Sequence, residues 1–262
     1  MNVSLIITTY NRYDALELVL NSIENQKVKP YELIIADDGS DQMTKVNIKK
    51  YIKKSSLNII HSWQEDIGFR LARSRNRAIG LSKGEYIVII DGDMILDSNF
   101  IADHIFHAKK HQFIQGSRVL LTEEKTLNLL RKGNISLSFF SKGISNRKNA
   151  IWSRTLSKIF SFKSKNIHGT RGCNMSFFKE DCIAVNGFNN EFEGWGREDS
   201  EFVMRFLNSG FRKLNLRFAA IQFHLWHGKE SNKSLPKNDE ILNNTISKKL
   251  SWCPLGLNEF LN

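Results

Sequence analysis

The sequence predicts an α/β fold in which helices cover both faces of a mostly parallel sheet. Two observations support this prediction. Segments with strand character alternate with amphipathic segments of helical period in the first half of the chain. These strands are also short and apolar, as in a parallel sheet that is buried on both sides. The expected strands are residues 3–9, 32–36, 57–61 and 86–90, and the expected helices between them are about 13–25, 42–54 and 70–82.

The length and composition suit a globular protein with a sizeable core. The chain has 262 residues, of which 41% are apolar, enough for one large domain or two small ones. It has no apolar run of about 18 residues and its N-terminus enters a strand pattern at once, so we expect neither a membrane-spanning helix nor a signal peptide. Cys173, Cys182 and Cys253 have no CxxC spacing and suit a reducing cytosol without structural zinc.

The second half of the chain is less regular. We expect a helix at 98–111, strands at 113–121 and 172–178, and a long strand at 214–223. The composition then turns polar, which predicts a loosely packed helix or arm over 229–262.

Polar motifs follow three of the expected strands: TTYNR after the first, ADDGSD after the second and DGDM after the fourth. Because parallel strands end at the same edge of a sheet, we expect these motifs to cluster there. Asp91 and Asp93 lie on the same side of an extended turn, which suits Mg²⁺ or Mn²⁺ carried on a diphosphate. Paired aspartates are also common turn residues, so the motif gains its weight from its place opposite ADDGSD.

Asp37 and Asp38 of the second motif begin a turn that ends at Gly39. Two adjacent charges at a buried strand end need partners, and a carboxylate there can accept from a pyrimidine N–H or a ribose hydroxyl. Tyr10 of the first motif offers a face on which a base can stack.

Four arginines lie in or beside the expected helix at 70–82. Arg70, Arg73 and Arg77 share one face, whereas Arg75 points elsewhere. A guanidinium near the helix start is suited to a diphosphate, although a single surface arginine is more often merely solvated.

The stretch GWGREDSEF, residues 194–202, places two carboxylates at the start of a helix. Glu198 and Asp199 precede an apolar series of helical period, where the helix dipole favours negative charge. Adjacent helical side chains point about 100° apart, so only one of the two can face a given hydroxyl. Asp199, three residues before Phe202 and four before Val203, is expected to be the inward one, with Glu198 nearly as well placed.

Two histidines three residues apart, His224 and His227, end the last expected strand. A lone histidine is usually structural, but a pair beyond a D-x-D motif can complete a metal shell. We therefore expect His227 as a metal ligand, with His224 beside it.

Taken together, TTYNR, ADDGSD, RNRAIG with GEYIVIIDGDM, and NGFNNEFEGWGREDSEF resemble the family 2 glycosyltransferases, which have the Rossmann-like GT-A fold. The last motif is similar to the C-terminal module of chondroitin polymerases and β-1,4-galactosyltransferases. The motifs occur in the family's order over about 1–228. The sequence departs from the pattern at Asn186, where the family often has the first glycine of GGF, and no family motif anchors residues 125–179.

The resemblance implies a division of the chain and a set of site residues. Residues 1–228 would form the GT-A domain, with a nucleotide-binding half at 1–112, an acceptor half at 113–228 and a basic insertion at about 125–170; 229–262 would be a C-terminal arm. The residues that would bind the nucleotide sugar are Thr8, Tyr10, Asp38, Arg70, Asp91 and Gly196. Trp195 would line the acceptor site, Asp93, His227 and His224 would hold the metal, and Asp199 and Glu198 would act in catalysis, with Asp199 as the base.

The resemblance also implies the reaction: inverting, metal-dependent transfer of a hexose or N-acetylhexosamine. The donor would be a UDP-sugar, the cofactor Mn²⁺ or Mg²⁺, and the acceptor a glycan or lipid-linked glycan in bacterial lipopolysaccharide or capsule assembly. Metal and arginine would stabilise the leaving diphosphate while a carboxylate removes the acceptor proton. A single displacement inverts the anomeric centre, so an α-linked donor gives a β-linked product.

The net charge of +11 belongs to one segment. Residues 125–179 hold twelve Lys or Arg and no acidic residue, which leaves 26 basic against 27 acidic residues elsewhere. Residues 151–163 set an apolar face among basic side chains, as in an interfacial helix, although an ordinary helix packed on the sheet shows the same pattern. The segment therefore suits an anionic membrane surface or an anionic acceptor, and we expect a cytoplasmic protein at the inner face of the plasma membrane.

Two other classes of protein share some of these features. A nucleic-acid-binding module would explain the pI of 9.6, but phosphate backbones would avoid the carboxylate clusters, so we expect no nucleic-acid partner. A nucleotidyltransferase on a related α/β sheet shares the D-x-D motif. It needs a glycine-rich phosphate loop near the N-terminus, which TTYNR does not supply.

Overall fold

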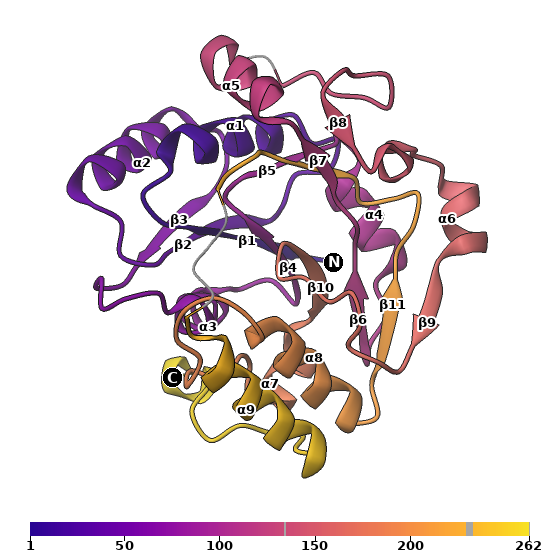
Figure 1. Ribbon diagram of the computed structural model, residues 1–262. Coiled ribbons are helices and arrows are strands. Elements are labelled where there is room, and N and C mark those ends of the chain that lie inside the picture. The colour runs from indigo at the N-terminus through magenta and orange to yellow at the C-terminus, as the bar shows by residue number, and fades with distance from the viewer. Residues whose placement is uncertain (134, 229–232, 262) are drawn as a thin grey trace.

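The computed structural model describes residues 1–133, 135–228 and 233–261. Its centre is an eight-stranded sheet with the strand order β3-β2-β1-β4-β10-β6-β11-β9 (Figure 1). The strands are β1 (Val3–Thr9), β2 (Glu32–Asp37), β3 (Ile59–Trp63), β4 (Tyr86–Asp91), β6 (Gln112–Gln115), β9 (Phe162–Ser164), β10 (Asn174–Phe178) and β11 (Arg212–Asn215).

The first four strands of the chain in this sheet are parallel. β1 pairs with β2 on one side and with β4 on the other, and β2 pairs with β3. β10 runs antiparallel to both β4 and β6, whereas β11 is parallel to β6 and β9 antiparallel to β11. The predicted α/β class is therefore confirmed. Strand order reverses between β1 and β4, the place where ligands bind in sheets of this kind.

Helices cover both faces because side chains of a buried strand alternate between them. Leu5 and Ile7 of β1 share a core with α1 (Tyr13–Glu24), α2 (Gln42–Lys54) and α4 (Phe100–His107). Ile6, between them, belongs to the opposite core, with α3 (Leu71–Leu81), α7 (Lys179–Ala184) and α8 (Glu198–Asn208). Figure 1 shows α3, α7 and α8 on one side of the sheet and α1 and α2 on the other.

A second, four-stranded sheet has the order β5-β12-β7-β8. Its strands are β5 (Met94–Leu96), β12 (Gln222–His224), β7 (Val119–Leu121) and β8 (Ile144–Ser145). β12 runs antiparallel to β5, with His224 opposite Met94, and the Leu225 N–H donates to the Asp93 carbonyl at 2.9 Å. This pairing brings the histidines to the DGDM turn.

Two predicted strands are wrong in their extent, because each is divided between the two sheets. Residues 113–121 form β6 and β7, with a break at Gly116, where a Cβ would lie 2.2 Å from the Asn174 side chain. Residues 214–223 form β11 and β12. Between them Phe218 and Ala220 have φ of 58° and 47°, in the left-handed region that ends a strand.

The basic segment is built of short elements. α5 (Glu123–Lys132) begins at Thr122, whose hydroxyl accepts from the Lys125 N–H, and ends at Gly133 with φ 67°. The helix expected at 151–163 is shorter, α6 (Arg154–Phe160), preceded by the 3₁₀ turn η1 (Arg147–Ala150). No helix among the described residues is long and apolar enough to cross a bilayer.

We expected a loosely packed helix or arm over 229–262, a range in which 229–232 and 262 lie outside the described residues; the segment does contain a helix, but this helix is closely packed. α9 (Leu235–Ser247) packs on α8, and the buried Thr245 hydroxyl donates to Glu201 at 3.0 Å. Beyond it, Leu257 in the 3₁₀ turn η2 (Leu257–Phe260) is fully buried against the α3 side of the sheet. Burial of Leu242, Cys253 and Leu257 explains the tight packing of this polar segment.

Candidate active site

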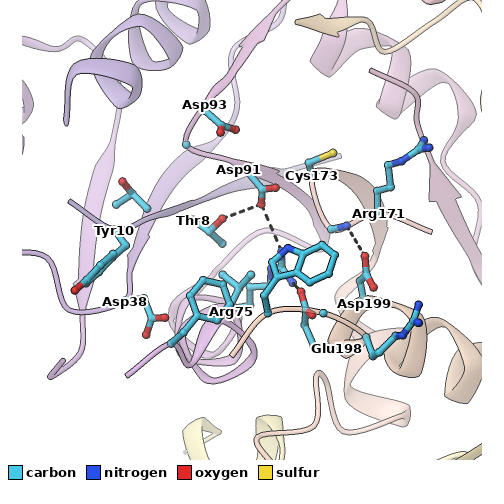
Figure 2. A pocket seen from close by; sticks show the side chains of 18 of the residues that line it. Thr8, Tyr10, Asp38, Arg75, Asp91, Asp93, Arg171, Cys173, Glu198 and Asp199 are labelled. Atoms are coloured by element: carbon cyan, nitrogen blue, oxygen red, sulfur yellow. Dashed lines mark hydrogen bonds and ion pairs between the residues drawn. The ribbon is translucent and has the colours of Figure 1, made fainter. Parts of the chain in front are cut away.

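A cavity of about 430 Å³ opens at the carboxyl ends of β1 and β4. The loop 194–197 and the first turn of α8 form its opposite wall. Of the residues predicted for the site, the structure brings these to the cavity: Thr8, Tyr10, Asp38, Asp91, Asp93, Trp195, Gly196, Glu198, Asp199 and His227. Arg70 and His224 do not line it. Figure 2 shows Tyr10 and Asp38 at one end and Asp199 and Arg171 at the other, with Asp91 between.

Tyr10 and Asp38 define the first end of the cavity. The Tyr10 ring is 45% exposed, and its hydroxyl donates to Asp66 at 3.0 Å. Asp38 is buried, which raises the pKa of its carboxyl, while hydrogen bonds from the Arg70 backbone N–H and the Gln64 amide oppose the rise. A buried carboxylate and an exposed ring face can bind the polar edge and the flat face of a base.

Arg70 takes part through its backbone only. Its N–H donates to Asp38 at 2.8 Å, and its guanidinium donates to the Glu65 carbonyl at 2.8 Å. The prediction that its side chain lies at the nucleotide site therefore has no counterpart in the cavity lining. Arg70 precedes the first turn of α3, so its backbone N–H has no partner within the helix and can donate to Asp38.

Asp93 lies at the centre of a cluster of basic side chains. Its Oδ2 is 3.3 Å from His224 Nε2, 3.5 Å from His227 Nε2 and 3.4 Å from Arg12 Nη1. Burial opposes ionisation, but the His224 hydrogen bond and the neighbouring positive charges lower the pKa of Asp93. His224 does not line the cavity, but it contacts Asp93, the predicted metal ligand.

The residues of this cluster fit a divalent cation. Donor atoms of Asp93, His224 and His227 all lie within 4.8 Å of one another. Asp93 Oδ1 is buried and has no hydrogen-bond partner among the described residues, as expected of an oxygen that has another ligand. One carboxylate and two imidazoles leave coordination positions for phosphate and water.

Arg75 connects two carboxylates of the cavity, those of Asp91 and Glu198. It is 1% exposed, and its guanidinium lies 3.4 Å from Asp91 Oδ1 and 3.1 Å from Glu198 Oε1. The Thr8 hydroxyl donates to the same Asp91 oxygen at 2.9 Å (Figure 2). A Cβ on Gly172 would lie 2.3 Å from Arg75 Nη2, so the absence of a side chain there makes room for the guanidinium.

The sequence reading missed Arg75 because it grouped the other three arginines on one face and left this one aside. A signal was present: Arg75 lies three residues after Ala72, three before Ala78 and four before Ile79, all buried on the inner face of α3. Arg12, Arg118, Arg171 and Cys173 also line the cavity without having been predicted.

Glu198 is the more buried member of the acidic pair, contrary to the expectation that Asp199 points inward. The Arg75 guanidinium donates to the buried Glu198 carboxylate at 3.1 Å. The spacing of apolar residues in α8 does not predict this contact. Burial and the adjacent Asp199 carboxylate raise the pKa of Glu198 to about 7, and Arg75 opposes the rise.

Asp199 is partly exposed to the cavity and is held by hydrogen bonds to both oxygens. Oδ2 accepts from the Gly172 N–H at 2.9 Å, and Oδ1 accepts from the Ser200 N–H at 2.6 Å. These bonds orient a carboxylate toward the open space between the two walls.

The glycines that flank Trp195 allow the loop to pack closely under α9. Gly194 and Gly196 have φ of 72° and 104°, and Cβ atoms there would lie 2.1 Å from Ser234 and 2.8 Å from Leu235. Trp195 itself stays 45% exposed, so its indole is available to a ligand.

Comparison with known proteins shows which family the chain resembles along its length. A family model described as glycosyl transferase family 2 matches residues 4–183, and one described as the N-terminal domain of galactosyltransferase matches residues 155–227. The chain is 29% identical over 238 residues to a chondroitin synthase of Pasteurella multocida and 27% identical over 266 residues to a chondroitin synthase of Escherichia coli.

These matches cover 80% and 90% of the chain but only 23% and 37% of the two relatives, so the chain spans about a quarter to a third of their length. Among solved structures, GalNAc-T7 with UDP, GalNAc and Mn²⁺ is similar in fold, with a TM-score of 0.68 at 13% identity over 95% of this chain and 49% of that one. The resemblance inferred from the motifs is confirmed.

Proposed function

Because the chain belongs to glycosyl transferase family 2 and is therefore a glycosyltransferase, we propose that it transfers a hexose or N-acetylhexosamine from a UDP-sugar to a glycan acceptor with inversion. One observation carries this proposal. Arg75 joins Asp91, at the end of β4, to Glu198, at the start of α8, so that donor-side and acceptor-side carboxylates face one cavity. Family membership favours this function over the nucleotidyltransferase and nucleic-acid-binding alternatives.

The donor would lie along the edge of the sheet. Tyr10 would stack on uracil and Asp38 would accept from its N–H or from a ribose hydroxyl, since both border the first end of the cavity. Asp91, held by Thr8, would bind the ribose or the sugar, and Arg12 and Arg75 would face the diphosphate with their charges.

Asp93, His224 and His227 would hold Mn²⁺, and the ion would supply positive charge to stabilise the departing diphosphate. Carboxylate oxygens suit both Mn²⁺ and Mg²⁺, but imidazole nitrogens favour the transition metal. GalNAc-T7, which has a similar fold, was solved with UDP, GalNAc and Mn²⁺.

Asp199 would act as the base. The acceptor hydroxyl oxygen forms a bond to the anomeric carbon while the bond from that carbon to the diphosphate oxygen breaks, UDP leaves, and the hydroxyl proton passes to Asp199. Glu198 would orient the acceptor and Trp195 would form a wall of its site. Attack from the side opposite the diphosphate inverts the configuration, so an α-linked donor gives a β-linked product.

The acceptor would be a glycan or lipid-linked glycan of bacterial lipopolysaccharide or capsule assembly, in line with the polysaccharide synthases that the chain resembles. The protein would work at the cytoplasmic face of the membrane. Exposed Ile159, Phe160 and Phe162, among Lys158 and Lys163, would contact an anionic membrane surface.

The donor is tested by hydrolysis and thermal-shift assays against UDP-, GDP-, dTDP- and CMP-sugars with Mn²⁺. We expect stabilisation and slow hydrolysis with UDP-galactose, UDP-glucose or a UDP-N-acetylhexosamine. Stabilisation by a GDP- or CMP-sugar, with none by any UDP-sugar, would refute the proposal.

A further inference from the structure

A second cavity, of about 350 Å³, lies next to the active-site cavity, and Arg171 lines both. It is formed by residues 115–117 at the end of β6, by η1, by Phe162 of β9, by the segment 168–171 and by residues 215–218 at the end of β11. No sequence motif pointed to it.

The lining of this cavity is basic. Lys148, Arg171 and Arg217 contribute cationic side chains, His168 lies beside them, and none of its lining residues is Asp or Glu. Among the described residues, no carboxylate lies within ion-pair distance of these three cations. Arg12 and Arg75 of the active-site cavity, by contrast, each contact a carboxylate. The charge of the second cavity is left for a ligand.

The three cations do not form the solvated face of one helix. They come from η1, from a loop and from the turn after β11, and they converge on one concave surface. Arg217 is further fixed by its guanidinium over the Phe162 ring, 5.4 Å from the centroid. A concave site suits a small ligand such as a compact anion.

Buried side chains fix the walls of the cavity. Gln115 accepts from the Arg171 N–H at 2.9 Å and donates to the Arg171 carbonyl at 3.2 Å. The ammonium of Lys213, a fully buried residue, donates to the His168 carbonyl at 2.8 Å and to the Thr170 hydroxyl at 3.1 Å. Burial lowers the pKa of Lys213 to about 8. The two hydrogen bonds replace water around its ammonium group and connect Lys213 to the segment 168–170.

The same loop reaches the proposed base. The residue after Arg171 is Gly172, whose N–H donates to Asp199 at 2.9 Å. Two consecutive residues, Arg171 and Gly172, therefore connect the lining of the second cavity to Asp199.

We propose that this cavity binds an anionic group of the acceptor, a carboxylate or a phosphate carried on a sugar, through Lys148, Arg171 and Arg217. The inference rests on the proposed function for the identity of the acceptor. It adds a charge requirement at a defined place, next to the position of the reacting hydroxyl.

The test is an NMR titration of the full chain with sodium glucuronate, inorganic phosphate and glucose. Both anions, or one of them, should shift the amide resonances of 115–117, 148–149, 168–171 and 215–218 in a saturable way, and glucose should not. The anion that binds identifies carboxylate or phosphate as the recognised group. Lys148→Gln and Arg217→Gln should each weaken binding about tenfold, as expected for loss of one charged hydrogen bond.

Lys142→Gln is the matched control, because Lys142 is an exposed cation of the same basic segment that lies outside the cavity lining. Equal weakening by all three substitutions would show diffuse charge attraction and overturn the proposal. So would the absence of saturable binding by either anion. Binding of phosphatidylglycerol vesicles that is lost in Arg217→Gln, without binding of the soluble anions, would assign the surface to the membrane instead.

The two proposals fail separately. Wild-type hydrolysis of UDP-sugars with Mn²⁺, measured without any anion, tests the donor reaction alone. If it succeeds and no anion binds, the present inference is wrong and the function stands; if anions bind and no UDP-sugar is bound or hydrolysed, the function is wrong. With an acceptor in hand, Arg217→Gln should raise KM for the anionic form but not for its carboxyl-reduced or dephosphorylated form.

Discussion

Asp199 and Glu198 are adjacent, yet their surroundings give them different work. Asp199 faces the cavity with its oxygens oriented by backbone N–H groups, whereas Glu198 is bound by Arg75. Asp199→Asn should therefore lower kcat by about 10² to 10⁴-fold, the usual contribution of a general base, and leave UDP-sugar affinity almost unchanged. Glu198→Gln should chiefly raise acceptor KM. Steady-state kinetics with a thermal-shift titration of UDP distinguish the two, and loss of kcat in Glu198→Gln alone would exchange the roles.

The ionisation of Glu198 predicts a pH dependence. Burial and Asp199 raise its pKa from 4.5 to about 7, so the side chain is protonated below that pH and pairs fully with Arg75 only above it. The raised value also means that Glu198 stabilises the fold below pH 4.5 and that this contribution is lost as the pH rises through about 7. We expect acceptor kcat/KM to rise between pH 6 and 8 and the rise to vanish in Glu198→Gln. A limb that persists in this variant would assign the titration to another group.

Asp93 is the residue on which metal binding should depend. Asp93 has a buried oxygen without a hydrogen-bond partner, and it is the one carboxylate of the cluster with His224 and His227 in the described part of the chain. Asp93→Ala should abolish turnover and the Mn²⁺-dependent stabilisation by UDP together, a stabilisation of about 2.7 kcal/mol at 100 times Kd in the wild type. Thermal unfolding with UDP, with Mn²⁺ and with both measures it. Full activity in excess EDTA would contradict a metal role.

Residue identities at strand ends could be predicted because each parallel strand delivers its last residues to one edge. Thr8, Tyr10, Asp38 and Asp91 all line the cavity for this reason. Arg75 could not be singled out, because its burial depends on Glu198, 123 positions along the chain. Spacing within one helix gives a face but not the partner that makes a buried charge tolerable.

At the scale of elements, the loop 194–197 is positioned by α9. Gly194→Ala, at φ 72°, places a Cβ 2.1 Å from the Ser234 Oγ and 2.6 Å from the Ser234 Cβ just before α9, whereas Gly133→Ala, at φ 67°, meets nothing within 4 Å. Both should lose about 1 kcal/mol to left-handed strain. Gly194→Ala should lose more and also raise acceptor KM, because Trp195 moves with the loop. Equal stability loss and unchanged KM in the two variants, by denaturation and kinetics, would show that α9 does not position the site.

The elements that the sequence left unresolved are those whose ends are set by long-range pairing. The apolar runs 113–121 and 214–223 read as single strands, and nothing local shows that each crosses from one sheet to the other. The crossing of residues 214–223 from one sheet to the other matters for function, because β12 pairs with β5 and so places His224 against Asp93. Alternation and turn residues predict strands, but the choice of neighbour depends on the assembled core.

At the scale of the whole molecule, the basic residues of 125–179 contribute to two surfaces, which Phe162 connects. Lys148 and Arg171 line a cavity, whereas Lys158 and Lys163 stand beside exposed apolar side chains on α6 and β9. A net charge of +11 attracts any anion at long range, so binding alone does not tell these surfaces apart.

Charge reversal can separate them. Lys158→Glu with Lys163→Glu should reduce binding to phosphatidylglycerol vesicles, because each basic residue near an anionic surface contributes about 1 kcal/mol. Acceptor KM should stay nearly unchanged, since neither residue lines the second cavity. Wild-type vesicle binding should also weaken between about 0.05 and 0.3 M salt, as the screening length shortens. Vesicle sedimentation measures both effects; binding that ignores salt and charge reversal alike would remove the membrane from the function proposed for α6.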